Sequence, residues 1–177
     1  MHTRAIVVSE NIKDLKEAMS YPILNVDEEE IINEMGLLTS GLADYAEIID
    51  LKEDHDGKNM KDLIGYIDGY FVLGKEKIVF DANNQSDTYD VIVLKPNIEK
   101  FKSSYEEMLS NMRQALEDRK PNMGCIYQVK RLLSETDLHI YNIPYGMKTA
   151  EEFYEEFLCD KDYSDKFYLV SYFDVHY

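Results

Sequence analysis

The chain has 177 residues, of which 45% are hydrophobic and 12% aromatic, and its 35 acidic and 19 basic side chains give a formal net charge of −16. Because a disordered acidic tail would be poor in aromatic and branched residues, we expect a single folded domain over residues 1–177. Charge of this sign and size repels phosphate backbones and anionic lipid surfaces, which argues against direct binding to nucleic acid or to a membrane.

The cysteine content and the hydropathy pattern predict a cytoplasmic protein. Cys125 and Cys159 are too few for a disulfide-stapled scaffold and form no zinc motif, so we expect both to be buried thiols. No apolar stretch approaches the roughly 20 residues that a membrane-spanning helix needs.

The first part of the chain predicts one strand and two helices. Residues 5–8 are apolar and mostly β-branched, which is typical of a strand buried on both faces. Ser9 or Asn11 can cap a helix that continues to about residue 19. Residues 25–35 predict a second helix, with Ile31 and Ile32 facing inward and an outer face that is almost wholly acidic. Residues 37–57 fit either a helix or an irregular strand, and they end in a turn signal, Asp56-Gly57.

The middle of the chain predicts an antiparallel sheet. A short helix is expected over residues 58–67. Strands at 70–73 and 77–80 would form a hairpin that turns at Gly74, and a polar loop over 81–88 would lead to a third strand at 89–94. Three consecutive strands of this kind predict a meander around residues 70–94.

A long amphipathic helix over residues 97–119 should pack on this sheet. Its apolar residues recur every three or four positions: Ile98, Phe101, Tyr105, Met108, Leu109, Met112 and Leu116. Residues 125–133 are ambiguous, 137–143 predict a strand, and Thr149 with Glu152 has the spacing of a capping box that begins a helix to about residue 158. Residues 166–177 predict a C-terminal strand. The expected fold class is therefore α+β, with a mainly antiparallel sheet packed by the long helix and by shorter acidic helices.

The charge imbalance lies in two segments. Residues 27–56 contain eleven acids and one base, residues 151–165 contain seven acids and one base, and the rest of the chain is neutral. Carboxylates in the first turn of a helix stabilise it by about 0.3 to 1 kcal/mol each, but this does not explain the acids farther along. Residues four apart on a helix, such as Glu30 and Glu34 or Glu152 and Glu156, would stand about 6 Å apart, a spacing similar to that of neighbouring phosphates.

Catalytic signatures are missing from the sequence. It contains no GxGxxG, GxxxxGK[ST], HExxH, CxxC or GxSxG motif. The acidic run from Asp50 to Asp62 does not match a calcium loop, because Lys52 and Leu63 occupy ligand positions. Asp81, Asp87, Asp90 and Lys95 match a two-metal nuclease pattern poorly. The four histidines are not paired in sequence, and alternation should turn His139 away from the apolar face. We therefore expect no cofactor and no metal.

The sequence favours a non-catalytic inhibitor that mimics a polyanion and binds the basic nucleic-acid groove of a nuclease, restriction enzyme or CRISPR effector. In size and charge the chain is similar to phage anti-CRISPR and anti-restriction DNA mimics as a class. Its 14 tyrosines and absence of tryptophan favour a protein interface. The alternative for half or more of the seven tyrosines after residue 140 is a position in the core or in an edge strand. An immunity protein or antitoxin against a nuclease toxin, and a carboxylate enzyme that uses a divalent metal on nucleotides, are the alternatives. The residues expected to bind the basic partner are Asp27, Glu30, Glu34, Asp44, Glu47, Asp50, Glu53, Asp54, Glu152, Glu155, Glu156, Asp160, Tyr154 and Tyr163.

Overall fold

The computed structural model describes residues 2–11, 13, 29, 31–34, 45–51, 54–82, 85–117, 138–160 and 164–176. The strands within these ranges form one sheet of seven, six of them in the order β3-β4-β7-β1-β5-β6, while β2 pairs with β7. All strand pairs are antiparallel except β1 with β5. The predicted α+β class with a mainly antiparallel sheet is therefore confirmed.

Strand β1 (His2–Ser9) lies at the centre of the sheet. It pairs in parallel with β5 (His139–Asn142) and antiparallel with β7 (Phe167–His176). The side chains from Ala5 to Val8 are fully buried, because helices cover both faces of the sheet at this strand. The prediction of a strand buried on both faces is confirmed, and so is the C-terminal strand.

Two short strands flank this centre. Strand β6 (Gly146–Thr149) pairs with β5 and ends the order of the described strands on that side, so it is an edge strand of the sheet as far as the described residues show. Strand β2 (Tyr45–Ile48) pairs with the last residues of β7, whereas β4 pairs with its first residues. The ambiguous region 37–57 is therefore a strand at residues 45–48.

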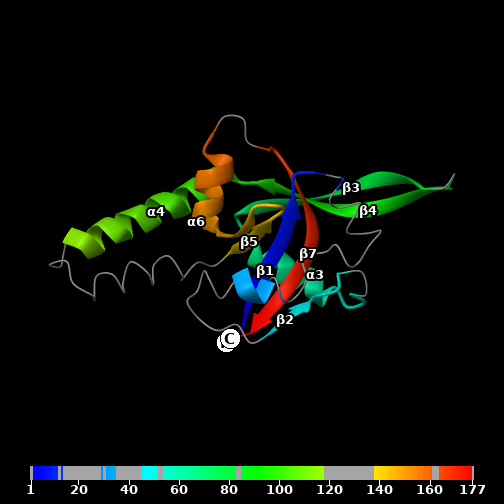
Figure 1. Ribbon diagram of the computed structural model, residues 1–177, viewed down its shortest axis with the longest axis horizontal. Helices are drawn as coiled ribbons and strands as arrows, with labels where there is room; N and C mark the ends of the chain where they lie inside the picture. Colours follow the sequence, from blue (N-terminus) through cyan, green and yellow to red (C-terminus); the bar gives the residue numbers. More distant parts are fainter. Residues whose placement is uncertain are drawn as a thin grey trace.

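The hairpin of β3 (Phe71–Ala82) and β4 (Gln85–Pro96) extends away from the central strands (Figure 1). The prediction of a turn at Gly74 and a loop over 81–88 was wrong. Gly74 pairs with Val93 within a continuous ladder, and Ala82 pairs with Gln85. A glycine can remain extended inside a strand as easily as it can turn, and here the chain reverses between Ala82 and Gln85. The region is thus one long hairpin instead of three strands.

Four helical elements are described with their bounds. Helix α3 (Lys58–Tyr66) and helix α4 (Ile98–Glu117) match the predicted helices 58–67 and 97–119, and α6 (Ala150–Phe153) continues into a π-helical turn, η2 (Tyr154–Leu158). Phe101 is the fully buried residue of the α4 stripe, and Leu116 near the other end is 54% exposed. Figure 1 shows α4 running away from the sheet, and among the described residues the stripe joins the core at its beginning, through Ile98 and Phe101.

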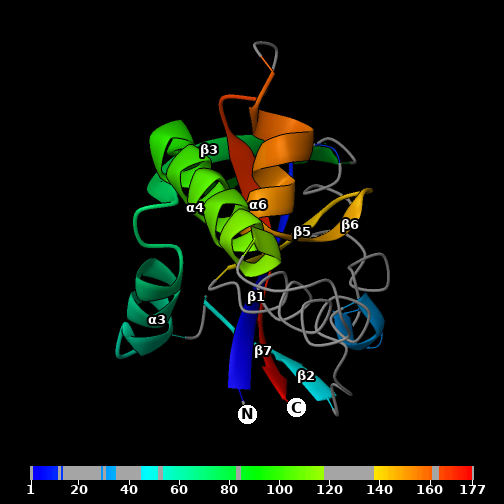
Figure 2. The ribbon, with the colours of Figure 1, turned by 90° about the vertical axis from the view of Figure 1, so that its left-hand side faces the viewer.

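The sheet has a core on each face. On one face, Ile6 and Val8 pack with Leu63 of α3, Phe101 of α4 and Phe153 of α6. On the other face, Ala5 and Val7 pack with Ile31, which belongs to a helical segment at 31–34. Figure 2 shows this segment and α3 on opposite sides of β1 and β7.

Parts of the remaining predictions lie outside the described residues. Asn11 accepts a hydrogen bond at its Oδ1 from the Lys13 N–H at 2.9 Å, which agrees with a helix cap at Asn11. The remainder of the helix expected up to residue 19, and the ambiguous region 125–133, are outside the described residues, as is most of helix 25–35.

Candidate acidic interface

The second acidic segment begins with the predicted capping box. The Thr149 hydroxyl accepts a hydrogen bond from the Glu152 N–H at 3.2 Å, and a Glu152 carboxylate oxygen accepts one from the Thr149 N–H at 3.0 Å. Glu151 points inward instead, where it accepts a hydrogen bond from the Ser104 hydroxyl of α4 at 2.6 Å. Glu155, Glu156 and Asp160 are exposed on and just after η2. The segment therefore combines structural carboxylates with surface carboxylates.

Part of the first acidic segment lies beside β6. The helical segment 31–34 is anchored by Ile31, which is fully buried, and Glu29 is exposed. Glu34 reaches the edge strand, where its Oε2 accepts a hydrogen bond from the Met147 N–H at 3.2 Å. A Cβ at Gly146 would stand 3.1 Å from the same oxygen, so the glycine leaves room for this carboxylate.

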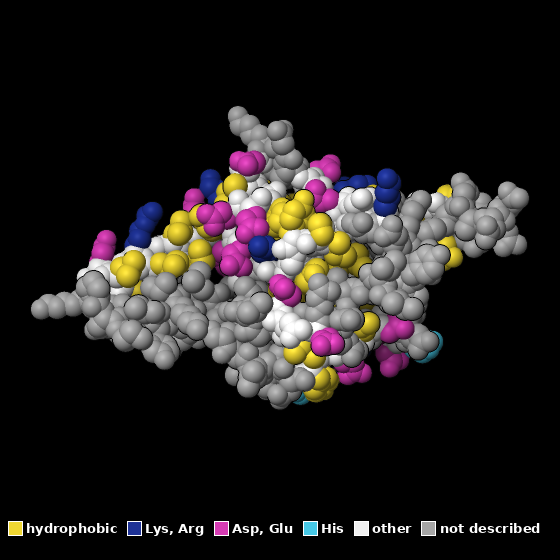
Figure 3. All heavy atoms as spheres, in the orientation of Figure 1, with side chains coloured by type: hydrophobic (Ala, Val, Ile, Leu, Met, Phe, Trp, Pro, Cys, Tyr) yellow, Lys and Arg dark blue, Asp and Glu magenta, His cyan; other side chains and the backbone are white. Residues whose placement is uncertain are grey.

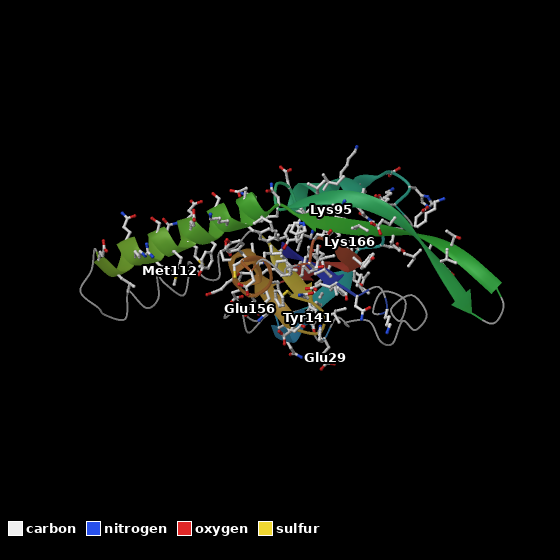
Figure 4. All side chains as sticks on the ribbon, turned by 90° about the horizontal axis from the view of Figure 1, so that it is seen from above. Glu29, Lys95, Met112, Tyr141, Glu156 and Lys166 are labelled. Atoms are coloured by element: carbon white, nitrogen blue, oxygen red, sulfur yellow. The ribbon has the colours of Figure 1, made fainter. Side chains whose placement is uncertain are left out.

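Strand β6 is where the two acidic segments meet. Residues 147 and 149 are two apart in the strand, so their N–H groups point to the same side. Glu34 of the first segment binds the N–H of residue 147, and Glu152 of the second segment binds the N–H of residue 149. An edge strand has backbone groups without a neighbouring strand, so these two carboxylates also cover the open edge of the sheet. Figure 4 shows Glu29 and Glu156 toward one side of the molecule and Lys95 toward the other.

Other described residues of the first segment lie at β2. Glu47 and Asp50 are exposed, in β2 and just after it. Four strand-to-strand steps separate β2 from β6, which at about 4.8 Å a step gives about 19 Å. Figure 3 shows acidic side chains gathered at two places on one face, over α6 and η2 and again near β2. The first segment is therefore divided between the β6 edge and the β2 end of the sheet.

Asp54 has a structural role at the start of α3. Its two carboxylate oxygens accept hydrogen bonds from the N–H groups of Met60, at 2.8 Å, and Asn59, at 3.1 Å. The hydrogen bond from Met60 is the largest influence that holds the pKa of Asp54 below its ordinary value. Gly57, which begins the helix with a φ of 64°, provides the left-handed turn that brings Asp54 back over the helix end.

The predicted partner-binding residues thus fall into three groups. The first group has a partner within the described chain: backbone N–H groups for Glu34, Glu152 and Asp54, and Lys148 at 3.0 Å for Glu156. The second group lies at the surface and comprises the exposed carboxylates Glu47, Asp50, Glu155 and Asp160, with Tyr154 half-buried against Tyr105. The third group lies outside the described residues: Asp27, Glu30, Asp44, Glu53 and Tyr163.

A second polar cluster, which the sequence did not predict, joins α3 to the sheet. The Arg4 guanidinium donates to Asp62 Oδ2 at 2.9 Å and also to Asp174, and the Tyr172 hydroxyl donates to the same Asp62 oxygen at 2.7 Å. Burial disfavours the charged form of Asp62, but the hydrogen bonds from Tyr172 and Arg4 outweigh it and lower its pKa. Burial, followed by the bond to Asp62, raises the pKa of Tyr172, so an ionised Asp62 faces a neutral phenol. No local pattern could reveal a cluster whose members are so far apart in sequence.

The tyrosines after residue 140 divide between core and surface. Tyr141, Tyr168 and Tyr172 are buried, whereas Tyr145 is 60% exposed and lies against Phe157. Tyr163 and Tyr177 lie outside the described residues. Tyr154 is half-buried, and it lies in η2, whose Phe157 is the residue that Tyr145 contacts.

The structure adds to one prediction and corrects another. His139 is only 3% exposed because β5 is covered on both faces, so a side chain on either face of this strand is buried. Cys159 is exposed and not buried, because it follows η2 at the surface; its Sγ lies 2.8 Å from the Glu155 carbonyl oxygen.

The described part of the chain contains no group of three or more His, Cys, Asp or Glu side chains placed to hold a metal ion. Every helix within the described ranges is too short or too polar to cross a lipid bilayer. Comparisons of the chain with protein-family models, curated proteins and solved structures found no match.

Proposed function

We propose that this protein is a non-catalytic inhibitor that binds the basic nucleic-acid groove of a nuclease, restriction enzyme or CRISPR effector in place of the polyanion. The observation that carries the proposal is the meeting of the two acidic segments at β6. Glu34 and Glu152 bind neighbouring N–H groups of the same edge strand, and exposed carboxylates at residues 29, 155, 156 and 160 belong to the elements that they anchor. We name this surface the β6 acidic face.

The hydrogen bonds within the β6 acidic face support its proposed role as an inhibitory surface. Glu34 and Glu152 accept these hydrogen bonds from uncharged backbone N–H groups and not from a base, so the bonds fix the positions of the two carboxylates without pairing them with a cation. Lys148 is the cation paired with Glu156, which leaves a strong excess of carboxylates over bases in this part of the described chain. Fixed charges of one sign attract a basic groove over distance and speed its encounter with the protein.

The proposal is tested by displacement of labelled DNA from purified restriction enzymes, RNA-guided nucleases and nuclease toxins. One variant reverses three exposed carboxylates of the β6 acidic face, Glu29→Lys, Glu155→Lys and Asp160→Lys. The matched control reverses three exposed carboxylates outside both acidic segments: Asp68→Lys, Asp90→Lys and Glu117→Lys. Both variants change the net charge equally. Glu34, Glu152 and Asp54 are left intact because their loss would disturb the fold.

We expect the β6-face variant to lose displacement while the control retains it. Equal displacement by the two variants would mean that net charge alone acts, and failure to displace DNA from any of the enzymes would contradict the proposal. The inhibition should also weaken as salt is added, because the attraction between exposed charges is screened over about 8 to 10 Å at physiological ionic strength.

A further inference from the structure

The η2 turn has an unusual backbone and an exposed ridge. The Cys159 N–H donates to the Tyr154 carbonyl at 2.9 Å, which closes a turn one residue wider than that of an α-helix. Single π-helical turns of this kind occur frequently at functional sites. Glu155 and Glu156 are the exposed residues at the middle of the turn.

Aromatic pairs lie on the two flanks of this ridge. On the flank toward α4, the rings of Tyr105 and Tyr154 are 5.4 Å apart. On the flank toward the β5–β6 turn, the rings of Tyr145 and Phe157 are 5.0 Å apart, and Tyr145 is 60% exposed. Aromatic side chains in such positions combine apolar area with π faces, which are features of protein-binding hot spots.

The Tyr105–Tyr154 pair has a carboxylate beside it, because the Tyr105 hydroxyl donates to Glu155 at 3.4 Å. Glu156 follows Glu155 in the chain and precedes Phe157. Glu156 already holds a cation, because Lys148 Nζ lies 3.0 Å from it. The ridge therefore combines the exposed carboxylates with the exposed ring of Tyr145 and with the half-buried rings of Tyr105, Tyr154 and Phe157. Carboxylates and aromatic faces both attract a cationic side chain.

We propose that the η2 ridge, formed by Tyr105, Tyr145, Tyr154, Glu155, Glu156 and Phe157, binds an arginine of the basic partner. This inference rests on the proposed function and names the side chain that anchors it. A guanidinium is planar, stacks on aromatic rings and can donate two parallel hydrogen bonds to one carboxylate. A lysine ammonium is a more strongly hydrated point charge and cannot use both features in this way. The ridge should therefore favour arginine over lysine at equal charge.

The test compares fluorescently labelled octa-arginine and octa-lysine binding to the full chain at one salt concentration. We expect tighter binding of octa-arginine. Tyr145→Ala should weaken the binding of octa-arginine roughly threefold to tenfold, the range expected for loss of one cation–π contact. It should weaken the binding of octa-lysine less. Tyr145→Phe should retain the octa-arginine affinity because it keeps the ring. Tyr89→Ala, which removes an exposed tyrosine from β4, should change neither affinity.

The outcomes separate this inference from the proposed function. Equal affinities for the two peptides, or an unchanged octa-arginine affinity in Tyr145→Ala, would overturn the arginine site and leave the β6 acidic face as a purely electrostatic surface. Absence of binding to either peptide would contradict the proposed function as well. Tyr145 is mostly exposed, so its replacement is not expected to unfold the protein, and a circular dichroism melt checks this directly.

Discussion

Removal of Glu152 should destabilise the protein, whereas removal of Glu155 should not. Both changes to alanine delete one negative charge from neighbouring turns of the same helical element. Glu152 accepts a hydrogen bond at 3.0 Å from the N–H of Thr149, a residue that is only 3% exposed, whereas Glu155 accepts a long, exposed one from the Tyr105 hydroxyl at 3.4 Å. Comparison of the two variants therefore distinguishes a carboxylate that stabilises the fold from one that lies at the surface.

The size of the Glu152→Ala effect follows from the Thr149 N–H, which loses its hydrogen-bond acceptor. A backbone N–H that loses its partner at a buried position costs about 1 to 3 kcal/mol, and the loss of a carboxylate from the first helical turn adds about 0.3 to 1 kcal/mol. Relief of repulsion among the neighbouring glutamates and the better helix propensity of alanine offset part of this. We expect Glu152→Ala to lower the free energy of unfolding by about 1 to 2 kcal/mol, and Glu155→Ala to change it by less than about 0.5 kcal/mol.

Thermal and urea unfolding followed by circular dichroism measure this difference. For a chain of this length, a loss of about 1 to 2 kcal/mol lowers Tm by roughly 2 to 8 °C. Thr149→Ala should produce a similar decrease because it removes the other half of the capping box. Equal unfolding midpoints for Glu152→Ala and Glu155→Ala would refute the assignment of Glu152 to the fold.

Two further changes test the contacts at α3. The pKa of Asp54 is lowered in the fold from an ordinary value of 3.8. The stabilisation that the Asp54 carboxylate provides is therefore complete at a pH above the ordinary pKa and is lost as the pH falls through the lower pKa of the folded state. The urea midpoint of Asp54→Ala should therefore lie below that of the wild type at neutral pH and approach it below about pH 4; a gap that widens in acid would contradict the cap. Arg4→Gln should lower the free energy of unfolding by about 1 to 3 kcal/mol, between the values of exposed and buried ion pairs, because Arg4 and Asp174 are mostly buried while Asp62 is 44% exposed. Adding Asp62→Asn should restore part of this loss in urea unfolding, since it removes a carboxylate left without its cation, and an undiminished loss in the double variant would count against the Arg4 cluster.

Local patterns in the sequence were enough for the elements whose signals are short in range. The buried run at residues 5–8, the 97–119 stripe and the Thr149–Glu152 capping box each depend on residues within a few turns of one another, and each element is present. Gly74 shows the limit of such reasoning. Whether a glycine turns or continues a strand depends on the partner strand, and here Val93 lies opposite it across the ladder.

The candidate site was only partly predictable for the same reason. The sequence indicated where the carboxylates are concentrated, but not which of them bind the backbone. Glu34 meets Met147 across more than a hundred residues, and no pattern near either one signals the contact. The exposed position of Tyr145 and its contact with Phe157 likewise depend on how the β5–β6 turn meets η2.

The most direct test of the β6 acidic face is the mapping of backbone amide chemical shifts in the isotope-labelled protein as an enzyme whose DNA it displaces is added. We predict that the perturbed amides cluster at residue 29, at 31–34, along β6 and over 150–160, and that those around Asp68, Asp90 and Glu117 are unaffected. Perturbations concentrated on the β3–β4 hairpin, with the amides of β6 and η2 unchanged, would contradict the account.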